Sequence, residues 1–257
     1  MTYCLSLLCR EGMVCISDSR TSAGVDNIAV QSKMRVFAEE GQRVLCLMTS
    51  GNLSLSQTVL SLIEEDLLRG KVEPEIHHLM NRPTMFETAR YVGQKIRQVA
   101  DLDRAALEAN GFAFNVNILL GGQIAGLPPQ SFLVYPQGNS LHTTVSAPFL
   151  QIGEFKYGKP ILDRGFHYGT HLTEAVKLGI LSMEATMKSN VAVGPPIDVF
   201  VLESDSLAVR KRVRIEENDD YLRTIQEKWG TGIVRLVEEM PGLEFPDVPF
   251  QPGAILP

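Results

Sequence analysis

The sequence predicts an α+β protein in which antiparallel sheets are covered by helices, rather than a doubly wound parallel sheet. Short apolar segments separated by tight turns open the chain, two helical segments follow, and blocks of strands and helices then alternate. Strands and helices grouped in blocks are typical of α+β architectures. With 257 residues, 44% of them hydrophobic, we expect one domain over residues 1–240.

The opening of the chain has the pattern of two β-hairpins. The four expected strands are 2–8, 13–17, 34–38 and 44–48. The first two are separated by the turn at 9–12 and the next two by the turn at 40–42, which are the apolar runs and turn residues of hairpins. We therefore expect the sheet to begin as an antiparallel meander.

A helix is expected next, because apolar residues between 53 and 68 recur at helical spacing. Asn52 or Ser54 can cap its start, and Gly70 ends it. Two further helices are expected at 84–100 and 170–188. The remaining strands are expected at 112–120, 131–135 with a hairpin towards Leu141, 198–202 and 209–215.

The end of the chain differs from the rest. An acidic stretch at 216–220 is expected to start a terminal helix, and the single tryptophan, Trp229, to pack that helix on the core. Residues 241–257 contain five prolines yet carry six large apolar side chains. We expect this tail to dock on another surface, and a neighbouring subunit is one candidate.

Composition excludes several classes of function. The chain has 24 basic and 30 acidic residues, a net charge of −6, and no basic stripe of the kind that binds phosphate backbones, so nucleic acid is not an expected partner. It has no apolar run long enough to span a membrane, and Arg10 and Glu11 interrupt any secretory signal. We expect a cytoplasmic protein.

The four cysteines predict buried free thiols. Cys4, Cys9, Cys15 and Cys46 all lie in apolar segments, and none has a second cysteine or a histidine at the close spacing of a structural zinc site. We expect no metal and no other cofactor.

Thr2 raises a chemical question, because a threonine that follows the initiator methionine becomes the N-terminus once Met1 is removed. A free α-amine titrates near ~8, so it can accept the proton of the adjacent hydroxyl as that oxygen attacks a carbonyl. A cation would stabilise the developing charge, and a carboxylate would hold the cation. Lys33 and Asp18 have the required residue types, but almost any chain has an aspartate and a lysine this close to its start. Spacing alone therefore favours an ordinary strand start at Thr2 and a surface charge at Lys33.

The motifs decide between these readings. The segments TYCLSLL, SDSRTSAG, KMRVF and TSGN, in this order, resemble the opening of a proteasome β-type subunit. SDSRTSAGVDNI, TSGNL and IGEFKYGKPILDRG are similar to the bacterial proteasome-like Anbu family, named for an ancestral β subunit. The resemblance covers most of the chain. It implies the N-terminal-nucleophile hydrolase fold, a four-layer αββα sandwich with antiparallel sheets.

The resemblance also implies a role for each residue that matches the family pattern. Thr2 would be the nucleophile, Asp18 and Lys33 its charged partners, and Gly51 the donor of an oxyanion-hole N–H. Ser22 would pair its backbone with an extended substrate. The first specificity pocket, small and partly polar, would be lined by Thr21, Gln31, Thr49 and Leu53.

The second half departs from the proteasome pattern of two serines and an aspartate around the threonine. Glu154 stands where a serine is expected, Asn190 where an aspartate is expected, and Val193 where the second serine is expected. An asparagine brings no negative charge, and a valine side chain makes no hydrogen bond. Glu154 is expected to supply an acceptor in compensation.

Together these features predict a threonine-type endopeptidase or amide hydrolase that works in a homo-oligomer. Short peptides or unfolded chains are the expected substrates, and an unfoldase partner is not identified by the sequence. Two alternatives stay open. One is a scaffold that keeps the fold without catalysis, and the other is an amidase that acts on a small molecule.

Overall fold

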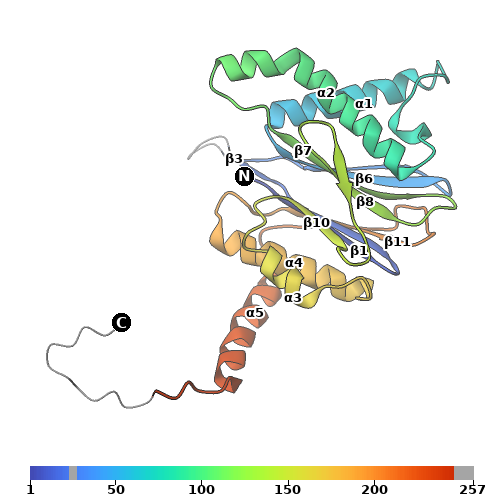
Figure 1. Ribbon diagram of the computed structural model, residues 1–257. Helices are drawn as coiled ribbons and strands as arrows, with labels where there is room; N and C mark the ends of the chain where they lie inside the picture. Colours follow the sequence, from blue (N-terminus) through green and yellow to red (C-terminus); the bar gives the residue numbers. More distant parts are fainter. Residues whose placement is uncertain (23–27, 246–257) are drawn as a thin grey trace.

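Two five-stranded antiparallel sheets face each other, and helices cover both outer faces, in the computed structural model, which describes residues 1–22 and 28–245 (Figure 1). The first sheet has the order β10 (Phe149–Gly153), β1 (Tyr3–Cys9), β2 (Gly12–Asp18), β11 (Ile197–Glu203) and β12 (Lys211–Ile215). The second has the order β5 (Met34–Glu39), β6 (Arg43–Gly51), β7 (Val116–Ile124), β8 (Gln130–Val134) and β9 (Ser140–His142). A small separate sheet pairs β3 (Arg20–Ser22) with β4 (Ile28–Val30).

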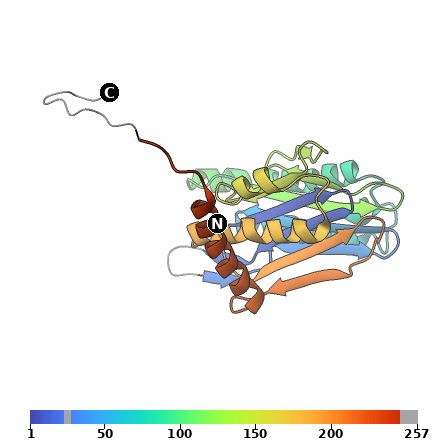
Figure 2. The ribbon, with the colours of Figure 1, turned by 90° about the horizontal axis from the view of Figure 1, so that it is seen from below.

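Helices α1 (Leu53–Arg69) and α2 (Met85–Ala109) pack on the outer face of the second sheet, with the short 3₁₀ helix Leu79–Asn81 between them in the chain. Helices α3 (Lys159–Gly165) and α4 (Leu172–Ser189) lie side by side on the outer face of the first sheet (Figure 2). No helix in the described residues is long and apolar enough to cross a lipid bilayer.

Both faces of the central strands are covered, which explains their continuous apolar sequences. All seven residues of β1 are buried. Tyr3, Leu5 and Leu7 pack towards α3 and α4, whereas Cys4 and Leu8 pack against the second sheet. One strand therefore contributes to two of the three hydrophobic clusters.

Three of the four cysteines lie between the two sheets. Cys4, Cys15 and Cys46 share this layer with methionines from both sheets, and all four cysteines of the chain are free thiols, as the sequence predicted. Burial raises the pKa of the Cys4 and Cys46 thiols well above the usual value and that of Cys9 to about 12. These thiols are apolar packing groups at neutral pH.

The predicted helix caps are confirmed. The Asn52 side chain accepts hydrogen bonds from the backbone N–H groups of Ser54 at 2.9 Å and Leu55 at 3.5 Å, and Gly70 ends α1. Helix α2 begins after its cap at Thr84 but continues to Ala109, about two turns beyond the prediction.

The meander prediction is wrong. The hairpin of β1 and β2 belongs to the first sheet, whereas the hairpin of β5 and β6 belongs to the second. In a meander β5 would pair with β2, but that edge of β2 pairs with β11, from Ile197 opposite Asp18 to Glu203 opposite Gly12. The other edge of the hairpin is also covered, because β10, a short strand that was not predicted, pairs with β1 from Tyr3 opposite Gly153 to Leu7 opposite Phe149.

Helix α5 (Asp220–Glu239) is capped by Asp219, whose side chain accepts from the Tyr221 N–H at 2.8 Å. The prediction that this helix packs on the core through Trp229 is not confirmed, because Trp229 is half-buried and Leu222 is the one buried residue of α5. The helix runs away from the layer of α3 and α4 (Figure 1). Of the predicted tail, residues 246–257 lie outside the described residues.

Candidate active site

Thr2 lies immediately before β1, and its backbone is fixed between β1 and β10. Its side chain and backbone are 8% exposed, and its carbonyl oxygen accepts a hydrogen bond from the Glu154 N–H at 2.7 Å. Gly153, the last residue of β10, has φ +85°, and a Cβ there would lie less than 3.0 Å from the Thr2 carbonyl oxygen. Only glycine therefore allows β10 to approach this closely.

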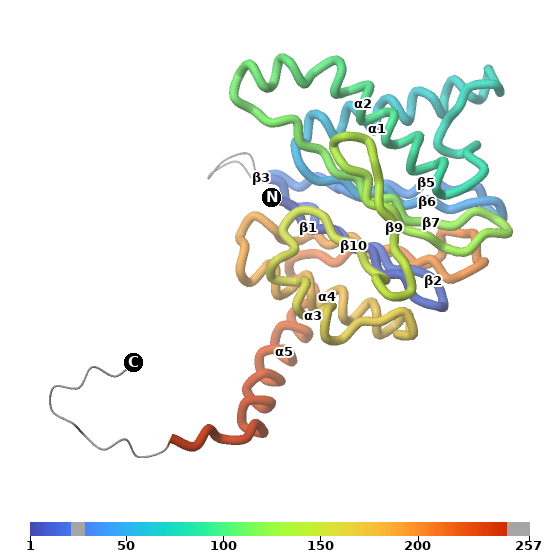
Figure 3. The backbone as a smooth tube through the Cα atoms, in the orientation of Figure 1, coloured from blue at the N-terminus to red at the C-terminus, as the bar shows by residue number. Residues whose placement is uncertain are grey.

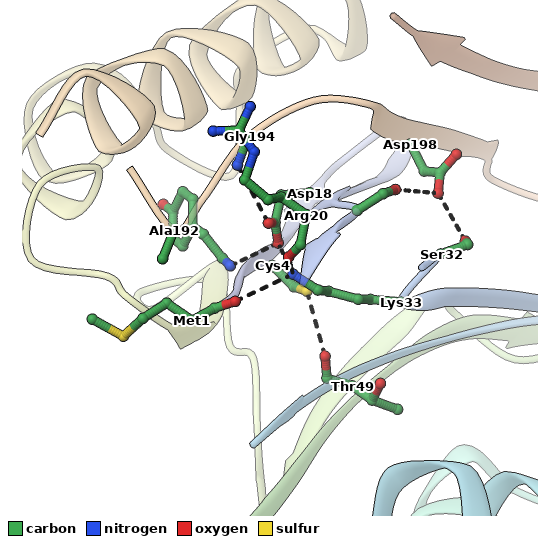
Figure 4. A network of polar contacts seen from close by, with 12 residues as sticks. Met1, Cys4, Asp18, Arg20, Ser32, Lys33, Thr49, Ala192, Gly194 and Asp198 are labelled. Atoms are coloured by element: carbon green, nitrogen blue, oxygen red, sulfur yellow. Dashed lines mark hydrogen bonds and ion pairs between the residues drawn. The ribbon is translucent and has the colours of Figure 1, made fainter. Parts of the chain in front are cut away.

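The predicted charged partners of Thr2, Asp18 and Lys33, contact each other beside the residues that flank Thr2 in the chain (Figure 4). Asp18 ends β2, Lys33 precedes β5, and the Lys33 ammonium donates to Asp18 Oδ1 at 2.7 Å. The two side chains are 0% and 7% exposed, respectively. Asp18 also accepts from the N–H groups of Tyr3 at 3.0 Å and Gly194 at 3.5 Å.

Burial raises the pKa of Asp18, and the Lys33 ammonium together with the two backbone N–H donors opposes that rise. The carboxylate thus depends on its cation. An unpaired carboxylate at this depth would favour its protonated form.

Lys33 uses its remaining donors on the backbone. Its ammonium donates to the Arg20 carbonyl at 2.6 Å and to the Met1 carbonyl at 3.4 Å. A lysine ammonium has three N–H donors. The two backbone contacts and the one to Asp18 use all three. Lys33 therefore reaches the peptide bond that joins Met1 to Thr2.

Sequence reasoning missed a second buried carboxylate, Asp198, which is 1% exposed at the start of β11. It accepts hydrogen bonds from Ser19 Oγ at 3.2 Å and Ser32 Oγ at 2.8 Å, and it pairs with Arg214 at 3.1 Å. Ser19 follows Asp18 and Ser32 precedes Lys33, so Asp198 joins the two segments that carry the charged pair (Figure 4). An acidic residue within the apolar run IDVFVLE was the one available signal.

Thr2 lies where two cavities meet. Met1, Thr2, Ser50 and Gly51 line both of them. One, of about 540 Å³, extends towards α1 and is also lined by the predicted pocket residues Thr21, Thr49 and Leu53. The other, of about 530 Å³, extends towards the ends of β7, β8 and β10.

The remaining predicted residues are distributed around these cavities. Gln31 lies outside the two, in a smaller cavity of about 290 Å³ that Thr49 and Leu53 also line. Gly51 ends β6 with φ +104°, where a Cβ would lie less than 3.0 Å from the Asn115 carbonyl oxygen, so this turn requires glycine. Ser22 is in β3, paired with Ile28 of β4.

Glu154 and Asn190, which replace the serine and aspartate of the proteasome pattern, contact each other. The Asn190 side-chain amide donates to Glu154 Oε2 at 3.3 Å. Glu154 follows Gly153 directly and holds the Thr2 carbonyl through its N–H. Val193 is 1% exposed and belongs to the hydrophobic cluster beneath α4, so it takes no part in the polar site.

The fold consists of facing antiparallel sheets with helices on their outer faces, and Thr2 lies near a buried lysine and aspartate. These features define a proteasome-like β subunit. Similar solved structures include Anbu (ancestral beta-subunit) from Yersinia bercovieri, which is 39% identical with a TM-score of 0.87 over 95% of this chain and 100% of that chain. Anbu from Hyphomicrobium sp. strain MC1 is 38% identical with a TM-score of 0.86 over 95% of this chain and all of that one. This protein belongs to the Anbu family.

A third similar structure is described as the helical assembly of the Anbu complex from Pseudomonas aeruginosa. It is 37% identical, with a TM-score of 0.88, over 94% of this chain and 98% of that chain. The chain matches no protein-family model and no curated protein.

Proposed function

We propose that this protein is a threonine-type peptidase with the N-terminal-nucleophile hydrolase fold, active after Met1 is removed. The observation that carries the proposal is the buried Lys33–Asp18 pair, whose ammonium reaches the Met1 carbonyl next to Thr2. The Thr2 hydroxyl attacks the scissile carbonyl, and its proton passes to the Thr2 α-amine. The leaving amine takes that proton as the acyl ester forms, and a water activated by the same amine then hydrolyses the ester.

Removal of Met1 changes the surroundings of Lys33. The donor now directed at the Met1 carbonyl becomes free beside the new α-amine and hydroxyl. A cation at that place lowers the pKa of the amine, which favours the neutral base, and stabilises the hydroxyl oxygen as it gains charge. Asp18 keeps Lys33 in place, and the Gly51 N–H serves as the oxyanion donor.

The two cavities that meet at Thr2 support a peptide substrate over a small molecule. A chain that crosses the site has room on both sides of the reacting carbonyl, about 540 Å³ towards α1 and about 530 Å³ towards β8 and β10. Cleavage within a peptide needs binding space on both sides of the scissile bond. The backbone of Ser22 in β3 is our candidate for pairing with such an extended chain.

Glu154 is proposed to orient the α-amine in place of the missing serine and aspartate. Its carboxylate is held by the Asn190 amide, and its backbone is bonded to Thr2. A carboxylate accepts a hydrogen bond from the amine more strongly than a hydroxyl does. If Glu154→Gln leaves the rate of acylation unchanged, this assignment fails.

We further propose that the protein works as a cytoplasmic homo-oligomer without a cofactor and takes unfolded chains or short peptides. The solved structure of the Pseudomonas aeruginosa Anbu complex, described as a helical assembly, supports self-association. So do the exposed apolar side chains near the end of α5, which include Leu236, Val237, Met240, Leu243 and Phe245. An unfoldase partner is not identified.

The experiment is intact mass spectrometry before and after addition of a peptide epoxyketone, which needs both a free α-amine and the adjacent hydroxyl to close its ring. We expect loss of Met1 and one adduct per chain, with no adduct in Thr2→Ala or Lys33→Ala. Lys71→Ala removes an exposed lysine and should react normally. Retained Met1, or a processed chain that stays unmodified, would favour a non-catalytic scaffold, to which the buried Val193 also points.

A further inference from the structure

The cavity of about 290 Å³ opens from the larger one beside Thr2. Lys33, Thr49, Leu53 and Ser56 line both, so a side chain that enters from the reacting carbonyl passes between these residues into the smaller cavity. Beyond them the walls belong to β5 on one side and to α1 on the other. The inference below rests on the proposed function, because it concerns the substrate of the same site.

Arg35 supplies a positive charge to this cavity. Met34 packs between the sheets, so the next residue of β5 projects to the opposite face, towards α1. Arg35 is half-buried, and it takes part in none of the ion pairs among residues 1–22 and 28–245. Its guanidinium makes one long hydrogen bond, at 3.4 Å, to the Met34 carbonyl.

In the part of the chain that the structure describes, the other charges around the cavity do not neutralise Arg35. Lys33 is matched by Asp18, so this pair adds no net charge. Glu64 lines the far wall on α1, but its side chain is exposed, where water screens its charge. The remaining wall is uncharged and combines the polar residues Gln31, Ser32, Gln57 and Ser61 with Leu60.

We propose that this cavity binds an acidic side chain of the substrate, at the residue whose carbonyl is attacked, with Arg35 as its anchor. Within residues 1–22 and 28–245 no carboxylate pairs with this half-buried guanidinium, so an acidic side chain would give it charge-assisted hydrogen bonds. The amides of Gln31 and Gln57 and the hydroxyl of Ser61 can donate to the same carboxylate. A lysine or arginine side chain would meet Arg35 as a like charge, and a leucine would leave the polar wall without partners.

The test compares peptides that differ only in this side chain. A series of acetylated peptide epoxyketones ending in Glu, Gln, Leu or Lys is reacted with the mature protein, and adduct formation is followed by mass. In parallel, the corresponding peptide amides are titrated into the Thr2→Ala variant, which measures binding alone because no covalent adduct can form. We expect Glu to exceed Gln roughly tenfold in both assays, the ratio expected for a charge-assisted hydrogen bond.

Three variants identify the anchor. Arg35→Gln should abolish the difference between Glu and Gln, whereas Arg90→Gln, the same change on the exposed face of α2, should leave it intact. Glu64→Gln removes the one carboxylate among the described residues that line the cavity, and it should strengthen the preference for Glu.

The outcomes separate the two proposals. If no epoxyketone reacts but the Glu amide binds Thr2→Ala more tightly than the Gln amide, the acidic pocket stands and the peptidase proposal fails. If the epoxyketones react equally well, or Lys or Leu is preferred, the acidic pocket is wrong and the peptidase stands. The acidic-pocket proposal would also be overturned if no peptide amide binds, or if Arg35→Gln keeps the preference for Glu.

Discussion

Replacement of Lys33 by methionine should destabilise the protein strongly, because it leaves the Asp18 carboxylate buried without its cation. The ammonium lies 2.7 Å from Asp18 Oδ1, with the carboxylate fully buried and the lysine 7% exposed. At an effective dielectric constant of ~20 this separation corresponds to roughly 6 kcal/mol of attraction, part of which offsets the desolvation of the two charges. Loss of one partner of a buried pair typically costs about 3–5 kcal/mol.

The loss should depend on pH. Burial already places the pKa of Asp18 above its usual value, and removal of the opposing ammonium raises it further. A carboxyl group whose pKa is higher in the folded state binds more protons folded than unfolded, so stability falls as pH rises from the unfolded pKa through the folded one. The slope reaches at most about 1.4 kcal/mol per pH unit. Lys33→Met should therefore be least destabilised in acid.

Urea unfolding at pH 5 and pH 8, at one protein concentration because self-association contributes to apparent stability, measures both effects. Asp18→Asn combined with Lys33→Met removes both charges and should recover most of the loss. Lys71→Met, on the surface, controls for the substitution itself. A loss below about 1 kcal/mol that is equal at both pH values would show that the pair does not hold the site.

Three further changes test the parts around the pair. Gly153→Ala should cost at least about 2 kcal/mol and block adduct formation, because φ at this position is +85° and the added Cβ would collide with the Thr2 backbone. Gly126→Ala, at φ +76° with open space around it, is the control without the collision. Asp198→Asn weakens the acceptor that joins the segments carrying Asp18 and Lys33, so adduct formation should slow about tenfold while the cooperative unfolding transition persists. An unchanged rate would show that Asp198 does not support the site. Leu236→Lys on α5 should shift sedimentation to smaller species, whereas Val72→Lys, also exposed, should not; equal profiles would place the subunit contact elsewhere.

Local features of this fold could be predicted from the sequence because they depend on neighbours in the chain. The caps of α1 at Asn52 and Gly70 follow from side-chain and backbone chemistry within a few residues. The hairpin of β1 and β2 follows from its turn. The amphipathic pattern of α5 is equally evident in the sequence, but such a pattern does not identify the surface that packs against it. In the structure only the first turns of α5 pack on the rest of the protein.

Long-range pairings could not be predicted in this way. The placement of β10 beside β1 joins residues about 145 positions apart, and no local pattern marks that partner. Asp198 meets Ser19 across 179 positions for the same reason. Thr2, Asp18 and Lys33 were found through their order in a known motif, whereas Arg35 and Asp198 emerged only when the strands and helices were assembled in space.

The buried cysteines between the two sheets are intrinsic probes of unfolding. Cys4, Cys15 and Cys46 each come from a different strand, and none is accessible until the two sheets separate. A thiol-reactive dye should label them at the rate at which that layer opens, without any engineered probe. The number of thiols modified per event would then show whether the sheets part as one unit or strand by strand. The chain passes from the first sheet to the second after β2 and returns before β10, so the first sheet is built from both ends of the fold, and we expect a single cooperative opening (Figure 3).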